Sequence, residues 1–434
     1  MNYYSLNRKA PNVSFKEAVI KGIAPDKGLY FPETITKLPP DFFSSLKDFS
    51  KEDIAFQLME QFVGNDIDLI SLERIIQETV SFDFPLVQLT DQISTLELFH
   101  GPTMAFKDVG ARFMARCLGH FAENDNTSQE VTVLVATSGD TGGAVASGFL
   151  GVEGVNVVIL YPSGKVSDIQ EKQLTTLGQN ITALEVEGTF DDCQAIVKNA
   201  FVDETITGKI QLTSANSINV ARWLPQSFYF AYAYKQIENI EKSLVFSVPS
   251  GNFGNICAGM IAYKLGMPVS QFVASVNSND VVPRFLVNGQ YEPKRSVATI
   301  SNAMDVGDPS NFIRIRELFN QDTSKLRELV SSYSFTDAQT KTAMKHLFTH
   351  HDYIADPHGA VGYLGLQEYL KYNTEAQGIF LETAHPIKFL EVVEETIQQK
   401  VAIPAHIQQL IKKKKVAIPI KNYEEFKAYM LQSK

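Results

Sequence analysis

Lys107 is the residue in this sequence whose position best suits covalent chemistry. Gly101 and Pro102 separate a strand-like run from a helical pattern, which places Lys107 near a helix N-terminus and on its buried edge. Burial and the positive end of the helix dipole both disfavour an ammonium, so both lower the pKa of the amine. A neutral lysine amine can form a Schiff base. On this segment alone, an ordinary lysine extending from a helix edge to solvent is the favoured interpretation.

A glycine-rich turn, Ser250-Gly-Asn-Phe-Gly-Asn255, follows a strand pattern and opens a helix. Its glycines allow close backbone approach, and its amides suit a phosphate group. The turn matches neither the dinucleotide fingerprint nor the nucleoside-triphosphate lysine loop. Judged alone, it fits a structural strand-to-helix turn equally well.

Polar side chains also occur at the ends of two other strand-like runs. Thr137 to Gly142 offers hydroxyls and amides at a helix start, which favours an anion such as a substrate carboxylate. Asp140 within it would repel an anion, so a helix N-cap is the safer interpretation. Thr383 ends another strand-like run, where its hydroxyl can bond a ring nitrogen or, more commonly, satisfy the backbone of the turn.

Length and composition limit the classes of function. The chain has 434 residues, which favours two or three domains, and its net charge of -10 argues against a general nucleic-acid or anionic-membrane surface. No N-terminal signal core or apolar run of roughly 18 residues is present, so we expect a cytoplasmic protein with no membrane partner. The three cysteines, Cys117, Cys193 and Cys257, are far apart and offer neither a disulfide framework nor metal-ligand spacing.

The pattern of elements changes along the chain. Residues 1–90 predict a mainly helical segment, in which Ser14 to Glu17 form a capping box and Gly22 closes the helix. From residue 95, strand-like and helical runs alternate, which is typical of parallel sheets with crossover helices. We predict one α/β domain over 95–235 and a second over 236–434, with a second sheet beginning near Leu244. Ligands collect at the carboxyl ends of the strands in such sheets.

Taken together, these segments resemble the threonine synthase family. The resemblance includes His100 to Asp108, Thr137 to Gly142, Ser250 to Asn255 and Glu382 to Pro386, and it extends to Tyr3-Tyr4, Ala10-Pro11, Ser14 to Glu17, Ala24 to Tyr30, Asn216 to Arg222, Ala303 to Val306 and Pro309 to Phe312. It implies the tryptophan-synthase-β type of pyridoxal-phosphate fold. That fold is α/β, with two open, mainly parallel sheet domains and the cofactor between them, and here a helical N-terminal segment precedes them.

The resemblance also implies a role for each matching residue. Lys107 matches the Schiff-base lysine, Thr383 the partner of the pyridine nitrogen, and Asp140 the position near the ring hydroxyl. The cofactor phosphate would lie in the loop of Ser250, Gly251, Asn252, Phe253, Gly254 and Asn255. Thr137 and Ser138 would bind the substrate carboxylate, and Asn216, Ser217 and Arg222 the substrate phosphate, for which the planar fork of arginine is suited. Without the resemblance, Arg222 fits a surface ion pair.

The implied activity is conversion of O-phospho-L-homoserine and water to L-threonine and phosphate, with pyridoxal 5'-phosphate as cofactor, no metal, and a monomer or homodimer. The alternatives are a sister lyase, such as a serine or threonine dehydratase, and a catalytically silent protein that binds pyridoxal phosphate or phosphorylated amino acids. Gly359 departs from the pattern, because a larger residue is expected there. His358 and His385 receive no role.

Overall fold

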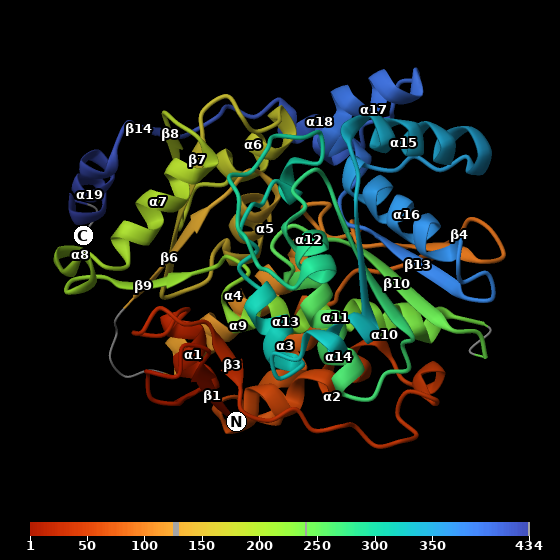
Figure 1. Ribbon diagram of the computed structural model, residues 1–434. Coiled ribbons are helices and arrows are strands. Elements are labelled where there is room, and N and C mark those ends of the chain that lie inside the picture. Colours follow the sequence, from red (N-terminus) through yellow and green to blue (C-terminus); the bar gives the residue numbers. More distant parts are fainter. Residues whose placement is uncertain (125–129, 239–240, 433–434) are drawn as a thin grey trace.

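Two sheets lie side by side in the computed structural model, which describes residues 1–124, 130–238 and 241–432 (Figure 1). The large sheet has six strands in the order β12-β11-β10-β13-β5-β4, and the small sheet has five in the order β14-β8-β7-β6-β9. Every neighbouring pair in the two sheets is parallel except β4 with β5. The predicted α/β class with mainly parallel sheets is therefore confirmed.

The strands of the large sheet are β4 (Leu86–Gln88), β5 (Ile93–Glu97), β10 (Leu244–Pro249), β11 (Gln271–Val276), β12 (Val330–Ser334) and β13 (Gln377–Glu382). Those of the small sheet are β6 (Val131–Ala136), β7 (Val155–Pro162), β8 (Ile181–Val186), β9 (Gln211–Ser214) and β14 (Ile418–Ile420). The central strands β6, β10 and β11 are buried along their whole length. Helices cover both faces of a parallel sheet, which explains their nearly continuous apolar sequences.

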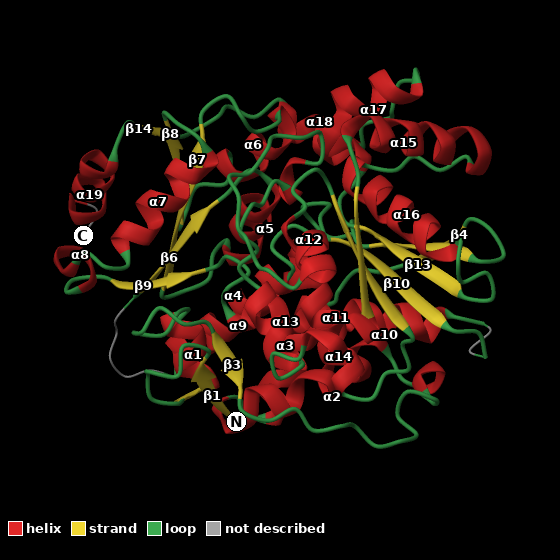
Figure 2. Ribbon diagram, viewed as in Figure 1, coloured by secondary structure: helices red, strands yellow, loops and turns green. Residues whose placement is uncertain are grey.

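Helices surround and separate the two sheets (Figure 2). Those that follow the first strands are α4 (Lys107–Glu123), α5 (Asp140–Phe149), α6 (Asp168–Thr175), α7 (Phe190–Ala200), α8 (Glu204–Thr207), α9 (Val220–Trp223), η3 (Leu224–Gln226) and α10 (Ser227–Gln236). Those of the second half are α11 (Gly254–Lys264), α12 (Val281–Asn288), η4 (Asn302–Met304), α13 (Phe312–Leu318), α14 (Thr323–Leu329), α15 (Asp337–His351), α16 (Pro357–Leu370), η5 (Pro386–Phe389), α17 (Leu390–Ile397), α18 (Ala405–Ile411) and α19 (Tyr423–Gln432). No helix among the described residues is long and apolar enough to cross a membrane.

The N-terminal segment lies against both halves, at the bottom of the view in Figure 1. Its helical elements are α1 (Phe15–Lys21), η1 (Leu46–Asp48), α2 (Lys51–Val63), η2 (Gly64–Asp66) and α3 (Leu69–Thr79). The predicted capping box at Ser14 and Glu17 is present, and Gly22 is the C-cap of α1. A separate three-stranded antiparallel sheet packs with these helices and consists of β1 (Asn2–Ser5), β2 (Val13–Ser14) and β3 (Tyr30–Pro32).

Strand pairing connects parts of the chain that are distant in sequence. β5 pairs with β13 in the large sheet, although β5 precedes the strands of the small sheet. β14 pairs with β8 in the small sheet, although it follows the large-sheet strands. The chain therefore crosses between the two sheets near its beginning and again near its end. The predicted domain boundaries, 1–90, 95–235 and 236–434, stay a prediction.

Candidate active site

Lys107 is the first residue of α4 and lies beside Thr383. The amide of Phe106 donates to the carbonyl oxygen of Thr383 at 2.8 Å, and Ala105 forms a bridge with Ala384. β5 and β13 are adjacent parallel strands, so the segments that leave their carboxyl ends run together. This pairing brings two predicted site residues to one place, the carboxyl edge of the large sheet, where ligands bind in such folds.

The amine of Lys107 is held in a desolvated setting, although part of the side chain stays accessible. Burial lowers the pKa of Lys107 to about 8. The Asp140 carboxylate acts in the opposite direction, and the charges of Lys388 and Arg222 add to the lowering. The neutral amine is therefore far more available than in an exposed lysine, as covalent and proton-transfer chemistry requires.

The turn after β10 forms a tight cradle at the start of α11. A Cβ on Gly251 would lie 2.8 Å from the carbonyl oxygen of Ala303, so the backbone of η4 leaves no room for a side chain. Phe253 adopts a left-handed conformation with φ of 61°, and Asn255 Nδ2 donates to the Pro249 carbonyl at 2.8 Å. α11 begins at Gly254, and the N-terminus of a helix attracts a phosphate. The chemistry of this cradle fits the cofactor phosphate.

Asn311 connects this turn to the predicted substrate-phosphate segment. Its backbone amide donates to the Asn252 carbonyl at 3.1 Å, and its side-chain amide donates to Ser217 Oγ at 3.1 Å. On the other side, Asn216 Nδ2 donates to the Ala136 carbonyl at 3.1 Å, next to Thr137. The segment 216–217 therefore lies between the glycine turn and the end of β6.

Arg222 is a buried cation without a carboxylate partner among the described residues. It lies on α9, which packs against α4, and its side chain donates to the Ala215 carbonyl at 2.6 Å. Its Nε has no hydrogen-bond partner. Burial lowers the pKa of Arg222 to about 10, so the guanidinium remains charged at neutral pH. The expectation of a surface ion pair is wrong, and an unpaired buried guanidinium suits an anionic ligand.

The turn after β6 is organised by Thr137. Its Oγ1 accepts from the amides of Gly139 at 2.9 Å and Gly142 at 2.8 Å, while Ser138 remains partly exposed. The interpretation of Asp140 as an N-cap is wrong, because Gly139 is the N-cap of α5 and Asp140 is its first residue. The carboxylate contacts Lys388 Nζ at 2.6 Å and accepts from Gln170 Nε2 at 2.8 Å instead.

The unexpected glycine at position 359 has a steric reason. A Cβ on Gly359 would overlap Oε2 of the buried Glu382 carboxyl group. Glu382 Oε1 accepts from the Asp356 amide at 2.6 Å, which fixes that carboxyl group. Burial raises the pKa of Glu382, and the neighbouring charge of Asp356 adds to the effect. Burial and the nearby Asp356 thus both favour the uncharged form of the Glu382 carboxyl group.

The two histidines without a predicted role are structural in different ways. His358 Nδ1 lies 2.6 Å from Asp356 Oδ1, and its Nε2 accepts from the Ala303 amide at 3.2 Å, next to the cradle at Gly251. His385 Nδ1 accepts from the Ile387 amide at 3.2 Å, and burial lowers the pKa of His385 to about 4. Each ring thus accepts a hydrogen bond from a nearby backbone amide and holds that backbone in place. No individual role follows from the sequence for Glu382, Asp356 or Asn311, although Glu382 and Asn311 lie in segments that carry the resemblance. Their roles come from contacts between distant segments.

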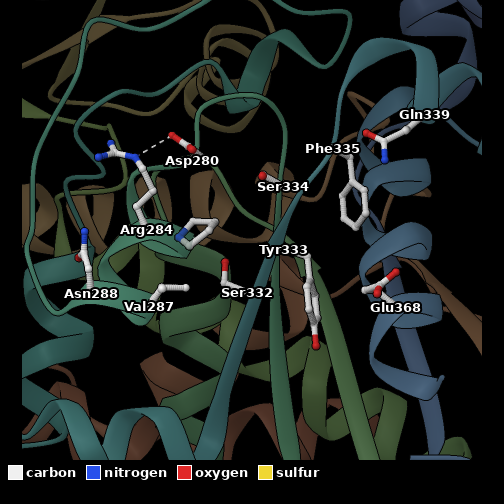
Figure 3. Close-up of a pocket in the computed structure, with 11 residues that line it drawn as sticks. Asp280, Arg284, Val287, Asn288, Ser332, Tyr333, Ser334, Phe335, Gln339 and Glu368 are labelled. Carbon is white, nitrogen blue, oxygen red and sulfur yellow. Dashed lines mark hydrogen bonds and ion pairs between the residues drawn. The ribbon is translucent and has the colours of Figure 1, made fainter. Parts of the chain in front are cut away.

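A hollow of about 550 Å³ lies elsewhere, at the outer edge of the large sheet (Figure 3). It is lined by residues of α12, β12, α15 and α16, and Figure 3 shows Arg284 turned toward Asp280, with which it forms an ion pair of 3.0 Å. β12 is separated from β5 by β11, β10 and β13. The hollow contains none of the predicted site residues, so it is distinct from the candidate active site.

The fold and the site define an enzyme of the pyridoxal-phosphate-dependent class. Lys107 supplies a desolvated amine, the turn at Gly251 forms a cradle whose chemistry suits a phosphate, and Thr383 lies beside Lys107. A family model described as pyridoxal-phosphate dependent enzyme matches residues 92–378. Models described as threonine synthase N terminus and threonine synthase, C-terminal match residues 2–80 and 359–430. The chain belongs to the threonine synthase family.

Individual relatives match this chain over nearly its full length. The chain is 42% identical to a threonine synthase of Escherichia coli over 413 residues, which covers 94% of each chain, and 43% identical to one of Serratia marcescens over 408 residues, covering 93% of this chain and 92% of that one. The crystal structure of threonine synthase from Escherichia coli superposes with a TM-score of 0.93 at 40% identity and covers 100% of both chains. A PLP-bound threonine synthase from Brucella melitensis has a TM-score of 0.93 at 32% identity, covering 100% of this chain and 99% of that one.

A more distant likeness is limited to the fold. The structure of maize serine racemase superposes with a TM-score of 0.54 at 16% identity and covers 73% of this chain and 93% of that one. The likeness leaves about a quarter of this chain unmatched. At this identity the likeness concerns the fold alone, and the activity depends on the residues of the site.

Proposed function

We propose that this protein converts O-phospho-L-homoserine and water to L-threonine and inorganic phosphate, with pyridoxal 5'-phosphate held by Lys107. The observation that carries the substrate assignment is Arg222, a buried guanidinium with an unpaired Nε on a helix that packs against the lysine-bearing helix. A lyase acting on free serine or threonine has no phosphate for this cation to bind. A silent binding protein would use the Lys107 amine only to hold the cofactor and would not need it to move protons.

Each residue of the site has a proposed task. The turn from Ser250 to Asn255 would hold the cofactor phosphate, Thr383 would contact the pyridine nitrogen, and Asp140 would lie near the ring hydroxyl. Thr137 and Ser138 would bind the substrate carboxylate. Asn216, Ser217 and Arg222 would bind the phosphate that leaves. Thr137 Oγ1 already accepts two backbone amides, so its hydroxyl proton is the part that remains to donate to a carboxylate.

The bound cofactor supplies an electron sink for the bonds at the substrate's α carbon. The Lys107 amine would remove the α proton and then a β proton of the substrate. The bond between the γ carbon and the phosphate oxygen then breaks. A proton would be delivered to the γ carbon, which becomes the methyl carbon of threonine. Water would add its hydroxyl to the β carbon and give its proton to the departed phosphate, and Lys107 would return a proton to the α carbon. The buried setting that lowers the pKa of Lys107 supports these proton transfers.

The direct test is an assay of both products from O-phospho-L-homoserine with the purified protein loaded with cofactor. We expect threonine and phosphate in equal amounts. L-Serine and L-threonine are offered in parallel, and formation of ammonia and a keto acid from them without threonine from the phosphorylated substrate would favour a dehydratase. Tight binding of the substrate without either product would favour a silent binding protein.

Replacing Arg222 by glutamine is expected to weaken substrate binding. A charged hydrogen bond contributes about 1.5–3 kcal/mol, so KM for the phosphorylated substrate should rise roughly 10- to 100-fold. Inorganic phosphate should lose potency as an inhibitor by a similar factor. The control is Arg112→Gln, because Arg112 lies on α4 but its guanidinium contacts the Glu78 carbonyl. An unchanged KM in Arg222→Gln would remove Arg222 from the substrate site.

The activity should rise with pH. The base form of Lys107 is the uncharged amine, and burial lowers the pKa of Lys107 from 10.5 to about 8. The uncharged fraction therefore increases as the pH rises through 8 and is nearly complete above it. Single-turnover rates measured from roughly pH 6 to 10 should follow this curve. A rate that falls as the pH rises across the same range would contradict the role of Lys107 as base.

A further inference from the structure

A second buried lysine, Lys388, lies close to the amine of Lys107. It belongs to η5, which follows β13 of the large sheet, and its side chain is 0% exposed. Its Nζ lies 2.6 Å from Asp140 Oδ1 and donates to the Thr103 carbonyl at 2.9 Å. Asp140 belongs to the small sheet's first helix, and Thr103 to the loop that leads into Lys107. The ion pair therefore joins both sheets and the lysine loop.

The surroundings of this ion pair exclude water. Gln170 Nε2 donates to Asp140 Oδ1 at 2.8 Å, and Gln173 Nε2 donates to the Thr103 carbonyl at 3.1 Å. Ile387 and Ile169, which adjoin Lys388 and Gln170 in sequence, pack in one apolar cluster with Met104 and Ile407. A salt bridge buried in this way contributes little stability, because desolvation offsets the attraction. Stability alone is thus a poor reason for its presence.

The electrostatic consequence falls on Lys107. The charged groups that face its amine are Asp140 from α5, Lys388 from η5 and Arg222 from α9. Alone, a carboxylate beside a lysine favours the ammonium form, which can neither attack a carbonyl carbon nor accept a proton. Burial by itself raises the pKa of Asp140, but the charges of Lys388 and Lys107 outweigh it and keep the pKa well below its usual range. Asp140 therefore remains an anion and needs a permanent counter-charge.

We propose that Lys388 is a positioning residue that neutralises the Asp140 carboxylate and thereby keeps the Lys107 amine in its uncharged, reactive form. Asp140 is held in place for its ligand while the charge of Lys388 opposes its effect on the amine. The proposal deepens the proposed function, since it concerns the residue taken to be the base there. It rests on the Lys388–Asp140 ion pair and on the buried Lys107 amine that both charges act on, and it holds for any reaction at that amine.

The test measures how the reactivity of Lys107 depends on pH in the cofactor-free protein. Trace acetylation by acetic anhydride, followed by peptide mass spectrometry, reports the uncharged fraction of the Lys107 amine. Lys388→Met removes the charge and keeps an apolar chain of similar length, so the titration should move to higher pH by about one unit. Lys388→Arg keeps the charge and should titrate as the wild type does. Lys388→Met combined with Asp140→Asn should return the titration toward the wild-type curve.

The outcomes separate a charge effect from a purely structural tie. Overlapping curves for Lys388→Met and wild type, or a Lys388→Arg curve displaced as far as that of Lys388→Met, would overturn the proposal. If Lys388→Met does not fold, the double variant is measured instead, because it leaves no unpaired charge. A Lys107 titration like that of the wild type would then support the proposal, and a titration displaced to higher pH would overturn it. The pH profile of turnover in the loaded enzyme should move in parallel. The acetylation measurement requires neither substrate nor cofactor. A negative product assay would therefore refute the proposed function and leave the measured pH dependence of Lys107 acetylation unchanged.

Discussion

Replacing Lys107 by alanine should abolish turnover while the fold is kept. The amine is the group that we expect to hold the cofactor and to move protons at the substrate's α and β carbons, so its removal eliminates both covalent and acid–base catalysis. The loss should be at least about 10³-fold in kcat. The lysine begins α4 and makes no ion pair in the described residues, so its truncation should cost little stability. Product formation, cofactor absorbance and thermal unfolding are measured on the same preparation.

Lys51→Ala is a matched control for this variant. Lys51 is also the first residue of a helix, α2, but its Nζ contacts Asp83 Oδ1 at 2.9 Å on the surface. We expect Lys51→Ala to keep full activity. Normal turnover in Lys107→Ala would overturn the lysine assignment. Loss of activity accompanied by a cooperative unfolding transition far below that of the wild type would show that the residue acts through the fold.

Among glycine-to-alanine substitutions in the site, Gly359→Ala should cause the largest loss of stability. The new Cβ would overlap the Glu382 carboxyl group, which the Asp356 amide holds at 2.6 Å. To make room, Glu382 must break this bond and leave buried polar groups unpaired. The combined cost is about 2–5 kcal/mol in the free energy of unfolding. Urea denaturation of the cofactor-free protein measures it.

The same variant should also release the cofactor faster. Asp356 and His358 are held at the start of α16, and His358 supports the Ala303 amide beside the cradle at Gly251. Gly362→Ala on the same helix is the control, because its Cβ would meet Pro249 Cδ at 3.3 Å and requires only a small adjustment. We expect a change within about 1 kcal/mol for that control. A Gly359→Ala protein as stable as the wild type would mean that Glu382 does not occupy this space.

Local pattern alone predicted several elements correctly. The capping box at Ser14 and Glu17 and the C-cap at Gly22 are present because a cap depends on residues within one helical turn. The strand Val131–Ala136 and the helix beginning at Lys107 have the predicted positions, since long apolar runs and helical periods are fixed by the nearest neighbours in sequence. Asp140 was misread because its partners, Lys388 and Gln170, are remote in sequence.

The sequence by itself determined the class of fold, the family and the residue types that the chemistry requires, among them a lysine at a helix start and a glycine turn after a strand. These features are local or are repeated in order along the chain, so they can be read without coordinates. Only the tertiary structure decided that β5 joins β13 and thereby places Lys107 beside Thr383, that Lys388 faces Asp140, and that Glu382 excludes a side chain at position 359. The physical reason is that burial, charge neutralisation and steric exclusion are set by atoms that meet only when distant segments pack together.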